Sequence, residues 1–401
     1  MLRISTFSFV TLSLILLTVR CVNAQKPVLR EQHQIENGAD QTTAYLSIIK
    51  NKRIGVVANH SSMIGSKHLV DSLLKHGIAI QKIFTPEHGL RGTADAGASL
   101  ASGVDSTTGL HIVSLYGDKK APSATDLQDI ELMLFDLQDV GVRFYTYIST
   151  LTYVMEACAK ANIPLIVLDR PNPNGFYVDG PVLEPSFQSF VGLHPVPVVY
   201  GLTIGEYALM VNGEGWLKER LKCDLNVIKL KGYTHNMIVK LKLPPSPNLR
   251  NWKAVYLYPS LCLFEGTVVS VGRGTDVPFE VYGHPLIVSG SYKFKPKPVT
   301  GASKPKLVGE LCFGYNLGSN AEDFALKPAQ IDLHPLLQTY KELGNKTNFF
   351  NNYFKTLSGT DKLQKQIEAG LDAIAIRESW QNDLNRYKKV RVKYLLYPDF
   401  E

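Results

Sequence analysis

Residues 130–169 read IELMLFDLQDVGVRFYTYISTLTYVMEACAKANIPLIVLD, and they give the clearest sign of how this chain folds. The two ends of the stretch, 130–138 and 163–169, are aliphatic runs with the length of buried strands. Between them, residues 147–162 repeat apolar side chains at helical spacing. A strand, a helix and a strand in this order predict two parallel strands joined by a crossover helix.

The same alternation continues on both sides of this stretch. Strand-like runs lie at residues 53–59, 78–84, 110–116 and 223–230, and helical patterns lie at 68–77 and 203–219. We expect the helix at 147–162 to begin near Ser149 or Thr150, whose hydroxyls can cap a first turn. The pattern predicts an α/β fold, with a Rossmann-like parallel sheet that helices cover on both faces.

The character of the chain changes after residue 240. LPPSPNLRNW (243–252) is a proline-rich connection, which neither a helix nor a central strand would tolerate. We expect a Rossmann-like domain at 25–245, a connecting segment with active-site motifs at 246–284, and a smaller mixed α+β domain at 285–401. An active-site cleft is expected between the two domains. The basic segment KFKPKPVTGASKPK (293–306) is expected to be an exposed loop.

The first 24 residues resemble a secretory signal. An early arginine precedes an apolar run, and Val22-Asn23-Ala24 is a small-residue pattern that predicts cleavage after Ala24. We therefore expect a periplasmic or secreted protein. No later segment approaches about 18 consecutive apolar residues, so membrane insertion is not expected.

Charge and cysteine content restrict the classes of partner. The formal net charge is +7, and the basic residues concentrate late in the chain, where a solvated face accounts for them, so no nucleic-acid partner is expected. Cys158, Cys223, Cys262 and Cys312 lie far apart in apolar contexts without CxxC spacing, which favours buried thiols over zinc ligands. Their disulfide state and the oligomeric state stay open.

Polar side chains follow the end of each of the five strands between residues 53 and 169. In an open parallel sheet the carboxyl ends of the strands meet at one edge, where ligands bind. One such residue alone would be an ordinary turn or capping residue, but five coinciding ends predict a ligand site. The side chains are Asn59 and His60; Glu87, His88 and Arg91; Tyr116; Asp136, Gln138, Asp139, Arg143, Tyr145 and Tyr147; and Asp169, Arg170, Asn172 and Asn174.

The missing motifs narrow the kind of ligand. The sequence has no GxGxxG after its first strand and no GxxxxGK[ST], which removes the usual phosphate cradles of dinucleotides and nucleoside triphosphates. GLTIG (201–205) has threonine where a serine hydrolase needs its nucleophile. The histidines are scattered, without HExxH, so no metal or cofactor is expected. Carboxylates, amides, arginines and aromatic rings together favour a sugar.

Two glutamates fit the chemistry of sugar cleavage. Glycoside hydrolysis generally uses two carboxyl groups, one of which is kept protonated by its surroundings. Glu87, in FTPEHGLRG (84–92), follows an apolar strand that favours a protonated acid, although Arg91 opposes this. Glu265 is a lone acid in an apolar segment and must be paired or functional if it is buried. Arg273, between two glycines, can approach a carboxylate.

The sequence as a whole resembles the NamZ-type exo-β-N-acetylmuramidases. The resemblance covers nearly the whole chain after the signal segment, in the same order, and its FEGT to GHP and DVGVRFYTY blocks are highly specific. It is carried by NHSS, FTPEHGLRG, FDLQDVGVRFYTYISTL, LDRPNPNG, DGPVLEPSFQSFVG, GLTIGEYA, PSPNLRN, YPSLCLFEGTVVSVGRGTDVPFEVYGHP and YLLYPDF.

This resemblance implies an enzyme that releases N-acetylmuramic acid from the non-reducing ends of peptidoglycan fragments, such as N-acetylmuramyl-N-acetylglucosamine. It implies Glu87 and Glu265 as the acidic pair, in roles that stay open. The lactyl carboxylate of the sugar needs a cation, for which Arg273 or Arg143 is favoured over Arg91 and Arg170. The remaining expected substrate contacts are Asn59, His60, His88, Asp136, Tyr145, Tyr147, Asp169, Asn172 and Asn174.

Two other functions fit the same pattern. A non-catalytic periplasmic receptor for wall fragments also uses two lobes around a cleft, but it seldom needs acids in apolar frames. A metal-dependent hydrolase would lose its activity in a chelator. The stereochemistry also stays open, because it depends on the carboxylate separation and on whether the 2-acetamido group takes part.

Overall fold

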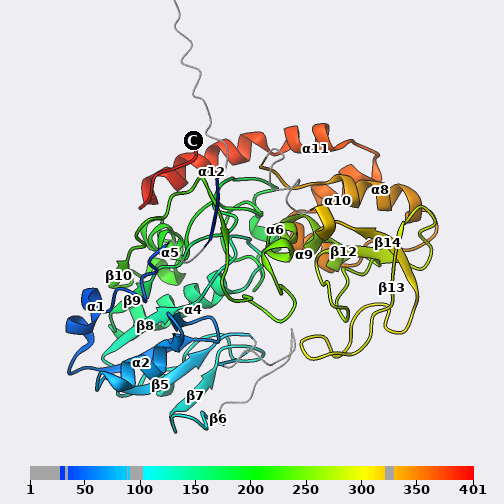
Figure 1. Ribbon diagram of the computed structural model, residues 1–401. Coiled ribbons are helices and arrows are strands. Elements are labelled where there is room, and N and C mark those ends of the chain that lie inside the picture. The colour runs from blue at the N-terminus through cyan, green and yellow to red at the C-terminus, as the bar shows by residue number, and fades with distance from the viewer. Residues whose placement is uncertain (1–27, 32–34, 88, 91–102, 321–328) are drawn as a thin grey trace, which may run out of the picture.

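The computed structural model describes residues 28–31, 35–87, 89–90, 103–320 and 329–401 (Figure 1). A seven-stranded sheet with the order β10-β9-β8-β2-β5-β7-β6 is its largest element. Every neighbouring pair is parallel except β6 and β7. The strands are β2 (Arg53–Ala58), β5 (Ala79–Thr85), β6 (Gly103–Val104), β7 (His111–Ser114), β8 (Leu132–Asp136), β9 (Leu165–Leu168) and β10 (Leu225–Ile228). The predicted Rossmann-like parallel sheet is confirmed.

Helices cover both faces of this sheet because successive side chains of a strand point to opposite sides. On one face, Val57 and Phe135 share a core with the long helix α4. On the other face, Val56 and Leu134 pack with the helices that flank the first strands. The helices of this part are α1 (Thr42–Ile49), α2 (Leu69–Lys75), α3 (Ala124–Leu127), α4 (Tyr147–Ala161) and α5 (Ile204–Gly213).

The start of α4 differs from the prediction. The helix begins at Tyr147, after Thr146, whose side chain makes no capping hydrogen bond. Ser149 and Thr150 therefore lie inside the first turn, where the Thr150 hydroxyl donates to the Thr146 carbonyl at 3.3 Å. A hydroxyl that can cap a helix can equally bond back to the preceding turn, so the sequence did not distinguish the two.

Two short pairs of strands, a three-stranded sheet and several 3-10 turns accompany the main sheet in the part of the chain that the structure describes. β1 (Val28–Glu31) pairs in parallel with β11 (Met237–Lys240), and β3 (Met63–Ile64) with β4 (Lys67–His68) forms a hairpin. In the second part of the chain, β12 (Val281–His284), β14 (Cys312–Asn316) and β13 (Tyr292–Phe294) form an antiparallel sheet. The 3-10 turns are Pro185–Phe187, Lys218–Arg220, Cys262–Gly266, Gly318–Asn320 and Val392–Tyr394.

A helix that the sequence did not predict leads into the second part. α6 (Trp252–Leu261) contains Pro259, which has no N–H for the carbonyl of Val255. The side-chain amide of Asn174 donates to that carbonyl at 3.2 Å, so the helix continues through the proline. The remaining helices are α8 (His334–Leu343), α9 (Tyr353–Ser358), α10 (Lys362–Glu368), α11 (Ala373–Ser379) and α12 (Gln381–Arg391).

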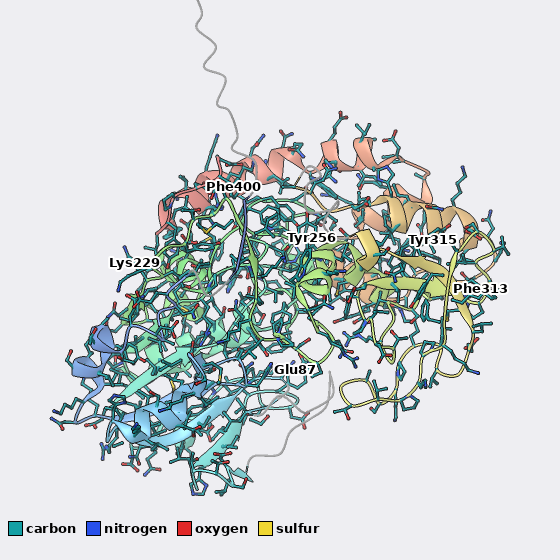
Figure 2. All side chains as sticks on the ribbon, viewed as in Figure 1. Glu87, Lys229, Tyr256, Phe313, Tyr315 and Phe400 are labelled. Carbon is teal, nitrogen blue, oxygen red and sulfur yellow. The ribbon has the colours of Figure 1, made fainter. Side chains whose placement is uncertain are left out.

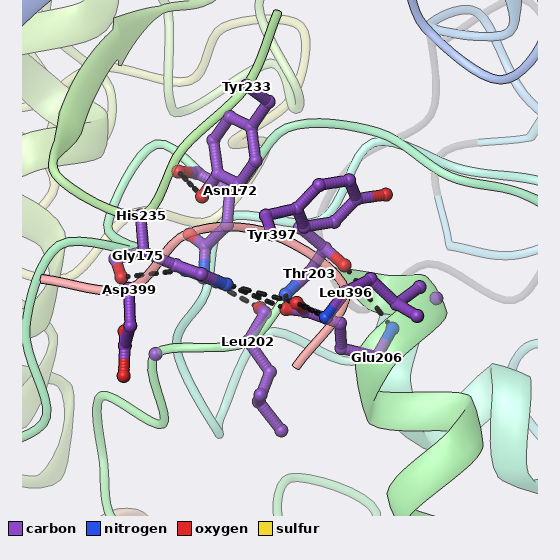
Figure 3. A network of polar contacts seen from close by, with 12 residues as sticks. Asn172, Gly175, Leu202, Thr203, Glu206, Tyr233, His235, Leu396, Tyr397 and Asp399 are labelled. Carbon is purple, nitrogen blue, oxygen red and sulfur yellow. Dashed lines mark hydrogen bonds and ion pairs between the residues drawn. The ribbon is translucent and has the colours of Figure 1, made fainter. Parts of the chain in front are cut away.

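The chain end returns to the Rossmann-like part. α12 runs back above α5 in Figure 1, and the residues after it insert into a polar network beside β9 and β10 (Figure 3). The Tyr397 hydroxyl donates to Asp169 at 2.5 Å and accepts from the Leu230 N–H at 2.9 Å. Glu206 accepts from the Leu396 N–H at 2.7 Å and contacts His235 at 2.9 Å. Among the described residues, no helix is long and apolar enough to cross a membrane.

Candidate active site

A pocket of about 630 Å³ lies where the carboxyl ends of β5 and β7 meet the segment after α6. Both glutamates singled out in the sequence line it, and Figure 2 labels Glu87 between the sheet and the second part of the chain. The volume falls within the range typical of small-molecule sites. Its polar and aromatic lining includes Glu87, Tyr116, Thr146, Tyr258, Glu265, Ser270, Arg273, Ser303, Lys304, Lys306 and Tyr353.

Glu87 lies two residues beyond β5 and is partly buried. Its carboxylate accepts a hydrogen bond from the Thr146 hydroxyl at 3.4 Å, which places it beside the amino terminus of α4. The Tyr116 hydroxyl also donates to Glu87, and burial together with this carboxylate raises the pKa of Tyr116. Tyr116 is therefore a neutral donor at physiological pH, aimed at the same acid.

Glu265 lies in the 3-10 turn after α6 and is held by Arg273. The guanidinium donates to both carboxylate oxygens, from Nε to Oε1 at 3.0 Å and from Nη2 to Oε2 at 2.7 Å. The Arg273 guanidinium also stacks over the Phe279 ring, 4.9 Å from its centroid. Burial alone would raise the pKa of Glu265, but the charge and hydrogen bonds of Arg273 outweigh it and lower that pKa. Glu265 is therefore ionised.

Lys306 fixes the backbone of the turn that carries Glu265. Its ammonium donates to four carbonyl oxygens, at distances between 2.5 and 3.4 Å: those of Phe264, Glu265, Thr267 and Val269. Burial lowers the pKa of Lys306 to about 8, with the nearby Glu265 acting in the opposite direction. The position of Glu265 in the pocket thus depends on a charged side chain from a distant segment.

Tyr353 lies close enough to both acids for their charges to act on its hydroxyl. Burial raises the pKa of its hydroxyl, and the charges of Cys262, Glu265 and Glu87 add to that effect. Both carboxylates therefore lie near the same phenol, which stays neutral and can donate a hydrogen bond. The arrangement offers a sugar two acids in contrasting environments, one of them paired with a cation.

Several residues that the sequence predicted as substrate contacts do not line this pocket. The amide of Asn59 donates to the Tyr147 hydroxyl at 2.7 Å, and the Tyr145 hydroxyl donates to the Pro245 carbonyl at 2.8 Å. His60 contacts the neighbouring Pro244 carbonyl, also at 2.8 Å. His60 and Tyr145 thus join the edge of the sheet to the proline-rich connection.

Asp136 and Arg170 form a buried ion pair at 2.6 and 2.8 Å. Arg170 lines a separate cavity of about 610 Å³, together with Ser61, Gln138 and Lys242. Asp169 accepts from Thr203 at 2.8 Å and from Tyr397, as described above. Asp136, Asp169 and Arg170 therefore do not line the pocket that holds Glu87 and Glu265.

Arg143, Asn172 and Asn174 do not meet the substrate pocket. Arg143 has no exposed surface and donates to four backbone carbonyls, those of Pro181, Val196, Leu357 and Ser358. Asn172 donates to the Leu202 carbonyl, and Asn174 supports α6. The expectation that Arg143 binds the sugar carboxylate is therefore wrong, because the guanidinium is buried and both of its terminal nitrogens donate to backbone carbonyls. His88 and Arg91 lie outside the described residues.

Several pocket residues were missed by the sequence reasoning. The basic segment contains Lys304 and Lys306, so a signal existed for these two, whereas Tyr116 was already expected at the edge of the sheet. Thr146 and Tyr353 carried none. Within the described ranges no group of three or more histidine, cysteine or acidic residues could hold a metal ion. Cys158, Cys223, Cys262 and Cys312 are buried free thiols.

Comparisons with known proteins identify the family to which this chain belongs. The family model for the N-terminal domain of exo-β-N-acetylmuramidase NamZ matches residues 54–253, and that for its C-terminal domain matches 256–397. Peptidoglycan β-N-acetylmuramidase NamZ of Bacillus subtilis strain 168 is 35% identical over 99% of this chain and 100% of its own length.

Two solved structures share the fold. Both are DUF1343 family proteins from Bacteroides fragilis NCTC 9343, and the alignments cover 91% of this chain and 99% of each of them. One has a TM-score of 0.85 at 46% identity, and the other a TM-score of 0.74 at 26% identity. The fold, the acid-lined pocket and the relatives together define a glycoside hydrolase. Within that class, the chain belongs to the exo-β-N-acetylmuramidase NamZ family.

Proposed function

We propose that this enzyme releases N-acetylmuramic acid from the non-reducing ends of peptidoglycan fragments such as N-acetylmuramyl-N-acetylglucosamine, and that it works in the periplasm or outside the cell. The family membership and the name of the Bacillus subtilis relative support the substrate class. The signal-like segment that ends at Ala24 supports the location.

The observation that carries the mechanism is the contrast between the two acids in one pocket. Glu265, ionised by Arg273, has no proton to give to a leaving group. Glu87 accepts hydrogen bonds from two hydroxyl groups, those of Thr146 and Tyr116, and lies beside the amino terminus of α4. We therefore assign Glu87 as the general acid that protonates the glycosidic oxygen, and Glu265 as the carboxylate that stabilises or attacks the positive anomeric centre.

The neutral phenols complete this assignment. Tyr116 keeps its proton, so its hydroxyl can donate to Glu87 and at the same time accept a hydrogen bond from a sugar hydroxyl. Tyr353, near both acids, can hold the sugar ring between them. Polar donors aimed at a site of developing charge stabilise a transition state more than they stabilise the ground state.

The direct test is product identification. Purified enzyme is incubated with N-acetylmuramyl-N-acetylglucosamine, and the products are separated and identified by mass spectrometry. We expect free N-acetylmuramic acid and free N-acetylglucosamine. Tight binding of the disaccharide without any cleavage over long incubation would instead support the receptor function.

The location has its own test. The protein is expressed in a Gram-negative host with its full N-terminus, and the mass of the exported form is measured. We expect a periplasmic protein that begins at Gln25. A cytoplasmic protein that retains its first 24 residues would contradict the proposed location without affecting the proposed reaction.

A further inference from the structure

N-acetylmuramic acid, the product under the proposed function, carries a lactyl carboxylate, and the three arginines considered for it that the structure describes all have partners within the protein. Arg273 is bound by both oxygens of Glu265, and Arg170 by both oxygens of Asp136. Arg143 donates only to backbone carbonyls in the interior. Among the described residues, the cation that binds the carboxylate must come from another segment.

The basic segment supplies two further cations to the pocket wall, Lys304 and Lys306. Lys306 is occupied, because an ammonium has three N–H donors and this one faces four carbonyl oxygens. Lys304 is exposed, and its side chain makes no hydrogen bond or ion pair with any other residue that the structure describes. Its charge is thus available to a ligand.

The segment Gly301–Lys306, which we call the lysine wall, is anchored at several points. At its start, the Asn248 amide donates to the Gly301 carbonyl at 2.7 Å. Gly301 has φ +87°, and a Cβ there would lie 2.5 Å from Pro247, so glycine permits this contact. At its end, Lys306 binds the Glu265 turn, as described above.

The lysine wall also packs against the turn that carries Arg273. A Cβ on Gly274, at φ +81°, would lie 2.7 Å from the Pro305 ring, so the two segments are in close contact. Just before the wall, the Lys297 N–H donates to the Gly274 carbonyl at 3.0 Å. Lys304 therefore extends from a backbone whose position is fixed relative to both partners of the Glu265–Arg273 pair, which reduces the entropy lost when it binds a ligand.

We propose that Lys304 is a specificity-determining residue, whose ammonium binds the lactyl carboxylate of the sugar held between Glu87 and Glu265. The proposal rests on the proposed function. A cation at the pocket wall favours a sugar with a carboxylate over the same sugar without one, while the reacting centre is the same for both. The lysine wall thereby selects N-acetylmuramic acid over N-acetylglucosamine.

The test compares two chromogenic β-glycosides, one of N-acetylmuramic acid and one of its lactyl methyl ester, which has no negative charge. We expect wild-type enzyme to prefer the acid. In Lys304→Met the kcat/KM for the acid should fall about tenfold, mainly through KM, as expected for a lost charge-assisted hydrogen bond. The kcat/KM for the ester should change less than about twofold, because no ion pair forms with it.

Two further variants serve as controls. Lys304→Arg keeps the charge and should retain most of the preference for the acid. Lys295→Met removes an exposed lysine from the same basic segment that does not line the pocket, and it should leave both substrates unaffected. Raising the salt concentration should reduce the preference of the wild type, because salt screens an exposed ion pair.

Four outcomes would overturn the assignment. An equal loss of kcat/KM for the acid and the ester in Lys304→Met would show a structural role for Lys304. An unchanged preference of this variant for the acid over the ester would show that another cation binds the carboxylate. A wild type that cleaves both glycosides equally well would show that the carboxylate is not recognised, without affecting the proposed reaction. A wild type that cleaves neither glycoside would contradict the proposed function itself, and Lys304 would lose its assignment with it.

Discussion

At the residue scale, the two glutamates of the pocket differ in what surrounds them. Glu265 has a bidentate guanidinium partner and an ammonium bound to its own backbone, whereas Glu87 has hydroxyl partners at the end of a strand. Placing two carboxyl groups in contrasting environments is the usual way in which enzymes separate an acid from a charged partner. The structure therefore supports different roles for two chemically identical side chains.

Arg273 is expected to set the ionisation of Glu265. In Arg273→Met, burial is no longer opposed by a positive charge, so the pKa of Glu265 rises and its ionised fraction falls at any given pH. We predict that kcat/KM at neutral pH falls about tenfold or more, and that the acidic limb of the pH profile moves to higher pH.

Arg250→Met is the matched control for this change. Arg250 forms an ion pair at 3.8 Å with the exposed Asp276, which lies three residues after Arg273 in the sequence. Neither Arg250 nor Asp276 lines the pocket. This variant should keep the wild-type profile. An Arg273→Met profile whose acidic limb coincides with that of the wild type would contradict the role assigned to the ion pair.

The sequence located the two acids together with Arg273 and Tyr116, but not Thr146, Lys306 or Tyr353. Glu265 was recognisable as a lone acid among apolar residues, and Glu87 by its place after a buried strand. Arg143 and Asn174 follow strands in the same way, yet they satisfy buried backbone carbonyls. A polar residue that binds a sugar and one that completes the interior look alike in sequence, because both need hydrogen-bond partners.

At the scale of elements, periodicity predicted the parallel strands well, because buried strands are continuous aliphatic runs. Periodicity failed to predict α6, because Pro259 cannot donate the usual helical hydrogen bond to the Val255 carbonyl. The distant Asn174 amide supplies that hydrogen bond instead. The sequence pattern also assigned the basic segment 293–306 to an exposed loop. Lys304 is exposed as expected, but Lys306 is partly buried, because it binds four carbonyls that only the tertiary fold brings together, and residues 301–306 line the pocket.

Lys306 predicts a pH dependence for the turn that carries Glu265. Its pKa is lowered to about 8 by burial, so the ammonium is charged below that pH and loses its proton above it. The contacts to the Glu265 turn then weaken, because a neutral amine is a poorer donor to carbonyl oxygens. We predict that kcat/KM declines as the pH rises through about 8.

The substitution Lys306→Arg separates this cause from others. A guanidinium stays charged far above pH 8, so the basic limb should move to higher pH in this variant. Lys295→Met, in the same segment but outside the pocket, should leave the limb in place. If Lys306→Arg retained the wild-type basic limb, a different group would be responsible for it.

At the scale of the whole molecule, the chain end ties the second part of the protein to the first. Tyr397 reaches Asp169 and Leu230, and Arg391 donates to Asp399 at 2.7 Å through both terminal nitrogens (Figure 3 shows the surrounding network). The two parts supply opposite walls of the pocket. Contacts far from the pocket therefore help to keep Glu87 and Glu265 in register.

We predict that Tyr397→Phe lowers the free energy of unfolding by about 1–3 kcal/mol, because it leaves the buried Leu230 N–H without a partner and removes one of the two hydrogen bonds to an Asp169 oxygen. Denaturant unfolding measures this difference. The control is Tyr394→Phe, which removes a hydrogen bond to the partly exposed Glu214 and should cost less than about 1 kcal/mol. Equal effects of the two substitutions would contradict the tethering role of the buried network.

The central claim is that Glu87 acts as the general acid of a sugar-cleaving site. The most direct measurement is the turnover of a chromogenic N-acetylmuramic acid glycoside by Glu87→Gln, a change that keeps the size and hydrogen-bonding capacity of the side chain. Substrate binding is measured separately by calorimetry. We predict intact binding and a loss in turnover of about 10²-fold or more, increasing with the basicity of the leaving group. Near wild-type turnover with intact binding would contradict the assignment.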